Sequence, residues 1–343
     1  GTRETRVGGI IRGQLDGDLF ERFEREGIEE RCESGAVETE DVVDAVTINH
    51  DGIVAVVLTQ CGDLGFFAVA GERTQRDGGR GAEKVRERTL SAGFGVDALT
   101  GAGTVKAGSP GWANSGLTVG VNNTAAGPAI FSGVVQDGGA GANQFIKTGT
   151  GTQILTGTNT YTGTTTITGG TLQVGNGGTV GTLGTGAVSV AGGSNLSFYR
   201  SNALTAGNAI SGAGSINFLG TGVQGQSDYA LSGNNSSFSG SINVSSSRLQ
   251  VSNPNQVGTA SITVNNGAGL WVNGTGMTIS NTLSLAGKGW LENAGDGYMG
   301  ALRLQNGATY SGPITLAADA RISAWNSSGT VSGLIRDGVG GAK

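Results

Sequence analysis

Pairs of apolar residues separated by one residue, usually small or polar, recur along the chain from residue 188 onward. Apolar residues at every second position indicate short β-strands with one buried face. Clusters of Gly, Asn, Ser and Thr separate the pairs and predict turns. The pattern predicts strands of about 4–5 residues each and argues against a mainly helical fold. The pairs are Val188/Val190, Leu196/Phe198, Ile216/Phe218, Ile242/Val244, Leu249/Val251, Ile262/Val264, Leu270/Val272, Leu283/Leu285, Leu302/Leu304 and Ile314/Leu316.

These predicted strands recur with a period of about 20 residues, as expected for the coils of a parallel β-helix. About 240 residues at this period predict about 12 coils, stacked at about 4.8 Å into a rod of order 60 Å. A β-sandwich could use the same alternation but would not be expected to repeat so regularly. The steps are Ile242 to Ile262, Leu249 to Leu270, Ile262 to Leu283 and Leu283 to Leu302.

A longer repeat supports the same architecture. The segment at residues 155–174 (LTGTNTYTGTTTITGGTLQV) recurs at residues 231–251 (LSGNNSSFSGSINVSSSRLQV) with one inserted residue. Stacked similar units of this kind indicate a solenoid. Gly suits the tight corners, and Asn at corners can form stacked ladders of hydrogen bonds. The corner asparagines are Asn159, Asn235, Asn253, Asn265 and Asn306.

The distribution of charge divides the chain in two. Residues 1–90 hold 31 of the 47 Asp, Glu, Lys and Arg residues, which leaves 16 for the other 253 residues. We therefore predict a charged N-terminal segment at 1–95 and a β-helix repeat region at 96–343. In the first segment, residues 45–58 read as two strands around a His-Asp-Gly turn. This segment is expected to cap the rod or to be a misassigned start. The chain ends in mid-pattern, so we expect truncation at its C-terminus.

Composition also limits the classes of function. The net charge of −5 gives no case for a nucleic-acid partner. No apolar run reaches the roughly 18 residues that a membrane helix needs, and the charged start does not read as a secretory signal. Cys32 and Cys61 both lie in the N-terminal segment, and their spacing does not indicate a metal site.

The segment at residues 145–174 closely resembles the autotransporter-associated β-strand repeat. A Lys-x-Gly-x-Gly-Thr lead is followed by Leu-x-Gly-x-Asn-x-Tyr-x-Gly and then by a Gly-Thr-Leu strand. The segments FSGVVQDG at 131–138 and VSGLIRDG at 331–338 resemble the strand that usually precedes this repeat. The matching residues are Lys147, Gly149, Gly151, Thr152, Leu155, Gly157, Asn159, Tyr161, Gly163, Gly170, Thr171 and Leu172.

The resemblance covers residues 100–343 and implies an all-β, right-handed parallel β-helix in the passenger region of a type V secreted bacterial autotransporter. It implies export across the outer membrane to the cell surface or the medium, with contact to the membrane only through a C-terminal barrel outside this sequence. It also implies coils that fold one after another, each templating the next.

The repeat region offers few groups for catalysis. The only histidine, His50, lies outside it and is expected in a turn. A Ser-His-Asp triad within the rod and a histidine metal site are therefore excluded. We expect no catalytic residue, no cofactor and no metal.

One cluster in the repeat region combines acids with aromatic residues: Trp290, Glu292, Asp296 and Tyr298. It can be read as a sugar-binding or catalytic loop, because polysaccharide hydrolases usually use a pair of carboxylates. It can also be read as a corner loop with exposed side chains, which is the interpretation we favour.

Three further tryptophans could contact a ligand. Trp271 lies between two predicted inward residues and should point outward, where it either meets a ligand or packs between coils. Trp112 and Trp325 could be exposed in the same way.

The sequence thus predicts a monomeric, non-catalytic passenger stalk displayed at the cell surface. Adhesion to a glycan or protein on a host or neighbouring cell is the expected use. The alternatives are a glycan-binding or polysaccharide-degrading β-helix protein and a phage tail fibre, which would be a trimer.

Overall fold

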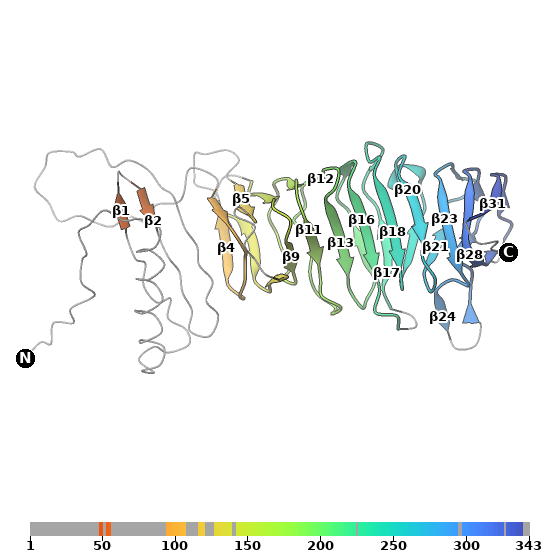
Figure 1. Cartoon of the computed structure of the whole chain (residues 1–343), viewed down its shortest axis with the longest axis horizontal. Helices are drawn as coiled ribbons and strands as arrows, with labels where there is room; N and C mark the ends of the chain where they lie inside the picture. The colour runs from red at the N-terminus through yellow and green to blue at the C-terminus, as the bar shows by residue number, and fades with distance from the viewer. Residues whose placement is uncertain are drawn as a thin grey trace, which may run out of the picture.

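The computed structural model describes residues 48–50, 53–55, 94–107, 116–120, 127–138, 142–223, 226–293, 297–325 and 327–338. The regular elements in these residues are β-strands, apart from one 3-10 turn, η1, at Pro254–Gln256. From β3 to β31 the strands stack side by side into a rod (Figure 1). This arrangement confirms the predicted parallel β-solenoid.

One sheet runs along nearly the whole described rod. Ten strands pair in parallel in it, so the described rod has about ten coils. We call this sheet side A. Its strands are β6 (Ala129–Phe131), β9 (Thr152–Leu155), β11 (Thr171–Val174), β13 (Asn195–Tyr199), β16 (Ser215–Leu219), β18 (Ser241–Ser245), β20 (Ser261–Val264), β23 (Leu283–Gly287), β28 (Ile314–Ala320) and β31 (Ile335–Asp337).

Two further sides complete each coil, and the chain visits the sides in the order A, C, B. Side B consists of a six-stranded sheet and a three-stranded sheet. The first contains β3 (Phe94–Val96), β5 (Gly116–Val119), β8 (Gln144–Lys147), β10 (Thr165–Ile167), β12 (Val188–Val190) and β15 (Ile210–Gly212). The second contains β22 (Thr278–Ile279), β27 (Thr309–Tyr310) and β30 (Thr330–Val331).

Side C consists of a two-stranded sheet near the start of the rod and a six-stranded sheet after it. The first contains β4 (Thr104–Ala107) and β7 (Val134–Asp137). The second contains β14 (Leu204–Ala206), β17 (Asp228–Leu231), β19 (Arg248–Val251), β21 (Gly269–Val272), β26 (Leu302–Leu304) and β29 (Ile322–Ala324).

In the N-terminal segment, the structure describes only one pair of strands before β3. β1 (Ile48–His50) and β2 (Ile53–Ala55) pair antiparallel, with His50 opposite Ile53. The predicted hairpin within residues 45–58 is confirmed, although His50 ends a strand rather than lying in the turn. Cys32 and Cys61 lie outside the described residues.

The described rod has fewer coils than the predicted 12, because several of its coils are longer than the predicted 20 residues. The step along side A is 19 residues from Thr152 to Thr171, but 26 residues from Ser215 to Ser241. It reaches 31 residues from Leu283 to Ile314.

The longest coil contains an inserted antiparallel hairpin, β24 (Leu291–Asn293) and β25 (Gly297–Tyr298). This insertion makes the predicted step from Leu283 to Leu302 wrong. Leu302 pairs with Leu270 on side C, whereas Leu283 pairs with Ile262 and Ile314 on side A.

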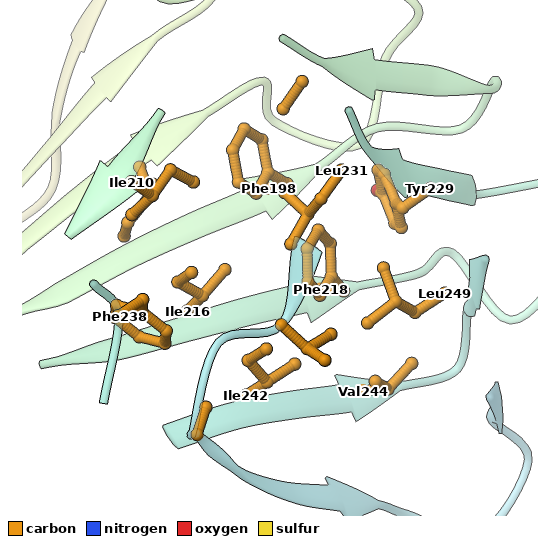
Figure 2. Close-up of a cluster of buried hydrophobic side chains, with 14 of the residues drawn as sticks. Phe198, Ile210, Ile216, Phe218, Tyr229, Leu231, Phe238, Ile242, Val244 and Leu249 are labelled. Atoms are coloured by element: carbon orange, nitrogen blue, oxygen red, sulfur yellow. The ribbon is translucent and has the colours of Figure 1, made fainter. Parts of the chain in front are cut away.

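The predicted apolar pairs do form the core of the rod. All of them are buried except Leu316, which is partly buried against the core. Aromatic rings pack together in this core: the rings of Phe198 and Phe218 stack between neighbouring coils with centroids 5.5 Å apart, and the rings of Phe218 and Tyr229, in one coil, are tilted with centroids 5.4 Å apart. Figure 2 shows this column of side chains in the middle of the rod.

The two copies of the sequence repeat fold alike but occupy different sides. In the first copy, Leu155 ends β9 on side A and pairs with Val174 of β11. In the second copy, Leu231 ends β17 on side C, and β17 pairs with β19, which ends at Val251. The repeat is therefore displaced by one side of the rod between its two copies.

The predicted ladder of corner asparagines is wrong. Asn265 and Asn306 donate to backbone carbonyls of neighbouring coils, and Asn253 caps η1. A bond between asparagine side chains instead occurs on the flat side A, where Asn243 Nδ2 donates to Asn217 Oδ1 at 2.9 Å. Backbone carbonyls at the corners accept hydrogen bonds from the asparagine side chains, because buried or half-buried carbonyls need donors. These amide groups are then not free to bond to one another.

Candidate functional site

The hairpin of β24 and β25 is the main irregularity on the otherwise regular side C. Gly289 and Gly300, at its base, form an isolated bridge, and the two strands pair only with each other. The hairpin projects from the rod in Figure 1. Its base lies next to β21, where a Cβ on Gly269 would contact Trp290.

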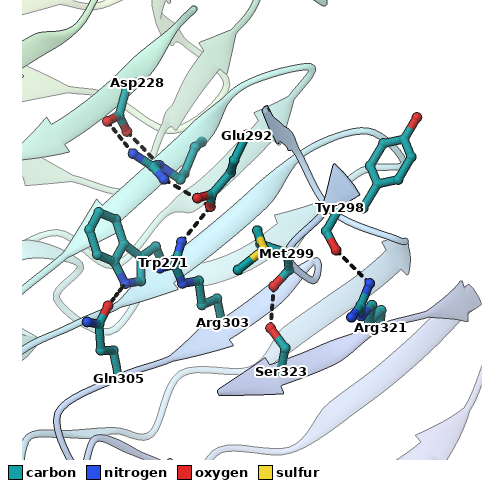
Figure 3. Close-up of polar contacts among 10 residues, drawn as sticks. Asp228, Trp271, Glu292, Tyr298, Met299, Arg303, Gln305, Arg321 and Ser323 are labelled. Carbon is teal, nitrogen blue, oxygen red and sulfur yellow. Dashed lines mark hydrogen bonds and ion pairs between the residues drawn. The ribbon is translucent and has the colours of Figure 1, made fainter. Parts of the chain in front are cut away.

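Two arginines on side C meet one carboxylate of the hairpin. Arg248 Nη1 lies 3.0 Å from Glu292 Oε1, and Arg303 Nη1 lies 2.6 Å from the same oxygen. Asp228 binds the other edge of Arg248, with Nε–Oδ1 at 2.9 Å and Nη2–Oδ2 at 2.6 Å. This two-point contact fixes the guanidinium plane and directs Nη1 toward Glu292 (Figure 3).

Tryptophan rings alternate with these guanidinium groups. The Arg248 guanidinium lies 4.5 Å from the ring centroid of Trp271 and 4.8 Å from that of Trp290. The Arg303 guanidinium lies 4.7 Å from the Trp271 ring and 5.2 Å from the Trp325 ring. Both distances to Trp271 fall within the range of cation–π attraction. We call this group of five side chains the Arg–Trp stack.

The charged side chains at this site are largely withdrawn from solvent. The side chains of Arg248 and Arg303 are 14% and 7% exposed, and that of Glu292 is 19% exposed. Burial lowers the pKa of Arg248, but its bonds to Asp228 and the charge of Glu292 outweigh burial and raise it. The Arg248 guanidinium therefore stays charged in a partly dry environment, where a buried charge needs an anionic partner.

The residues of the predicted loop that the structure describes differ in their exposure and in their contacts. Trp290 is buried and Glu292 is ion-paired, so the interpretation as a corner loop with exposed side chains is wrong for these two. Tyr298 is exposed, and its carbonyl accepts a hydrogen bond from Arg321 Nη1 at 2.6 Å. Asp296 lies outside the described residues.

The predicted outward position of Trp271 is confirmed, since it is half-buried between two fully buried neighbours on β21. Its Nε1 donates to Gln305 Oε1 at 3.0 Å. Trp325 is also half-buried, whereas Trp112 lies outside the described residues.

Sequence reasoning missed Asp228, Arg248 and Arg303. The 20-residue step from Asp228 to Arg248 equals the coil period and could have placed these two side by side. The step from Trp271 to Arg303 spans the inserted hairpin, so no regular spacing connects them.

The lysine of the repeat motif, Lys147, is buried and contributes to the structure of the rod. Lys147 is 1% exposed, and its Nζ donates to the carbonyls of Thr148, Gly149 and Gly169 at 2.5, 3.3 and 3.3 Å. Burial lowers the pKa of Lys147. The lysine thus closes a corner between two coils.

Within the described residues, no helix is long and apolar enough to span a membrane. The same residues contain no group of three or more His, Cys, Asp or Glu side chains that could hold a metal ion.

Comparisons with known proteins agree with the repeat. The model of the Passenger-associated-transport-repeat family matches residues 145–174. No curated protein and no solved structure matches the chain. The matched residues form β8 to β11 and the corners between them, which is one full turn of the rod from β8 to β10 and then the next strand of side A, β11. A passenger-associated transport repeat within a parallel β-solenoid of about ten coils fits an autotransporter passenger repeat protein, and the rod is a stalk of the passenger type.

Proposed function

We propose that this chain is the adhesive, non-catalytic stalk of an autotransporter passenger, exported across the outer membrane and displayed at the cell surface or released from it. Its partner is a glycan or protein on a host or neighbouring cell, and nucleic acid is not a partner. The stalk acts as a monomer. The observation that carries the proposal is the match to a passenger-associated transport repeat inside a parallel solenoid.

The surface of side A supports a role as a spacer. Register places one outward row of uncharged side chains along it: Gln173, Ser197, Asn217, Asn243, Thr263, Ser284 and Thr315. Several of these side chains bond to one another, as Asn217 Nδ2 does to Ser197 Oγ at 3.2 Å. This uncharged row, which ends at Arg336 on β31, offers little for catalysis.

Surface display is tested in cells that express the native gene. Antibodies raised against residues 142–338 should label intact cells, and protease added outside should remove the label. Deletion of the gene should reduce attachment to host or neighbouring cells. If only permeabilised cells are labelled, the surface role is wrong. If labelled cells attach as well without the gene, the adhesive role is wrong.

A glycan-binding or polysaccharide-degrading protein is the second candidate, favoured by the tryptophans and acids around the hairpin. A hydrolase would need a carboxylate pair free to act on a sugar, but Glu292 and Asp228 both bind arginine. Arg248 and Arg303 lie over the ring of Trp271, where a sugar could otherwise stack. A Glu292→Ala, Asp296→Ala double variant tests this candidate. Polysaccharide degradation that survives the double variant would place the activity elsewhere.

A further inference from the structure

The position of the Glu292 carboxylate is the feature of the rod that most resembles an occupied ligand site. One oxygen, Oε1, forms ion pairs with the Nη1 atoms of two arginines that lie on different coils. Arginine is the side chain best suited to bind a carboxylate, because its planar fork presents several donors. Two arginines converging on one oxygen form a site for a carboxylate, whichever molecule supplies it.

The rod holds Arg248 through bonds that do not involve Glu292, and it holds Arg303 through its strand and the rings of two tryptophans. Asp228 fixes Arg248 through two bonds, and Trp271 packs between the two guanidinium groups. Arg303 comes from β26, which pairs with β21 along its whole length. Glu292 instead belongs to a hairpin whose strands pair only with each other. The two arginines therefore belong to strands of the solenoid, whereas the carboxylate that they bind belongs to the inserted hairpin.

We propose that Arg248 and Arg303 form a binding site for the carboxylate of an acidic saccharide, and that Glu292 occupies this site until such a ligand displaces it. The inference rests on the proposed adhesive function and names the chemical class of its ligand. The exchange replaces one carboxylate with another at the same two Nη1 atoms, so no charge is left buried without a partner.

The surroundings favour a saccharide over an apolar peptide. The outward row on side C continues from Trp271 and Arg303 to Gln250 on one side and Ser323 on the other. Gln305 lies at the indole nitrogen of Trp271. Amide and hydroxyl groups of this kind match the hydroxyl groups of a sugar chain, whereas an apolar peptide would need an exposed apolar groove.

An internal carboxylate weakens the binding of an external one. The apparent affinity falls in proportion to the fraction of molecules in which the site is vacant. Glu292 is tethered to the site, so its effective concentration is of millimolar order or more. The wild-type chain should therefore bind an acidic saccharide weakly, and removal of the Glu292 charge should strengthen binding.

The test is a calorimetric titration of the chain with a galacturonate hexamer, with a neutral glucose hexamer as the control ligand. Glu292→Gln keeps the side-chain shape and should bind the acidic hexamer about tenfold or more tightly than the wild type. Adding Arg303→Met to Glu292→Gln should abolish this gain. Arg321→Gln removes the hydrogen bond from the rod to the Tyr298 carbonyl of β25, leaves Arg248, Arg303 and Glu292 in place, and should bind as the wild type does.

Several outcomes overturn the inference. They are equal affinity of Glu292→Gln and wild type, no binding by either at millimolar hexamer, and equal gain for the neutral hexamer. A glutamate hexapeptide that binds as well as the galacturonate hexamer would overturn the assignment to saccharides. Circular dichroism checks that each variant is folded, and Glu292→Ala replaces Glu292→Gln if the latter is not.

Attachment of cells separates this inference from the proposed function. Cells that attach through the chain but do so equally well with Glu292→Gln and with Arg303→Met would leave adhesion standing and remove the acidic-saccharide site. Loss of surface labelling would remove the proposed function and leave the calorimetric result unchanged.

Discussion

Asn159 and Asn235 make the same two hydrogen bonds, although they lie on different sides of the rod. Asn159 Oδ1 accepts from the Val135 N–H at 2.8 Å, and its Nδ2 donates to the Thr182 carbonyl at 2.7 Å. Asn235 Oδ1 accepts from the Ile210 N–H at 2.7 Å, and its Nδ2 donates to the Gln256 carbonyl at 2.8 Å. Each asparagine joins its coil to the coil before and the coil after. The repeat therefore specifies a hydrogen-bonded contact between coils that does not depend on the side of the rod on which it forms.

Replacing Asn235 with alanine should destabilise the rod by about 2 kcal/mol or more, because it leaves a buried N–H and a carbonyl without partners. Urea unfolding measures the change. Asn234→Ala is the control, since Asn234 is exposed and bonds only within its own turn to the Ser236 N–H. Equal stability of the two variants would show that the asparagine bridge contributes nothing.

Replacing Gly157 with alanine should also destabilise the rod, by about 1–3 kcal/mol. A Cβ at this corner would overlap the carbonyl oxygen of Gly133 in the preceding coil. Gly178→Ala is the matched control, because a Cβ there meets open space. We expect Gly178→Ala to be neutral or slightly stabilising in thermal unfolding. A Gly157→Ala variant that melts with the wild type would contradict the close approach of the two corners.

The sequence predicted the inward residues well because alternation depends only on neighbours along a strand. Ile242 and Val244, for example, are both fully buried as their spacing indicates. The same reasoning failed where a position depends on how many residues separate two coils. Leu302 matched the 20-residue period by coincidence, and the hairpin places it on side C instead.

The candidate site was only half predictable for the same reason. Trp290 and Glu292 were found because acids and aromatic residues are close together in the sequence there. Arg303 lies beyond the hairpin and Arg248 lies two coils earlier, so only the folded register brings them to Glu292.

Replacing Phe218 with alanine should cost about 3–5 kcal/mol, because its ring packs against the rings of Phe198 and Tyr229 in the core. In a solenoid each coil contacts mainly its neighbours, so the damage should stay local. Hydrogen exchange should rise in β13, β16 and β18 more than in β5 or β28. The exposed Val180 provides a control, Val180→Ala, with little expected effect. A uniform rise along the whole rod would indicate all-or-none unfolding instead of local opening.

The rod should lose stability above about pH 10 because of its buried tyrosines. Burial raises the pKa of Tyr161, Tyr229 and Tyr310. In the unfolded chain a tyrosine loses its proton near pH 10, whereas these three keep theirs in the folded state. The unfolded state then binds fewer protons than the folded state, so the free energy of unfolding falls as pH rises. Each such tyrosine costs about 1.4 kcal/mol per pH unit in this range.

Guanidinium unfolding at pH 9 and pH 11 measures this loss, and tyrosine-to-phenylalanine variants assign it. Tyr310→Phe removes a hydroxyl that donates to the Asn281 carbonyl at 3.0 Å, so it should lower stability somewhat at pH 9. It should nevertheless lose less stability than the wild type between pH 9 and pH 11, because its unfolded state has one fewer proton to release. Tyr161→Phe should reduce the loss further when combined with it, since the two tyrosines lie on distant coils. If both variants lose as much stability as the wild type over this range, the alkaline sensitivity comes from other groups and the buried hydroxyls are not its cause.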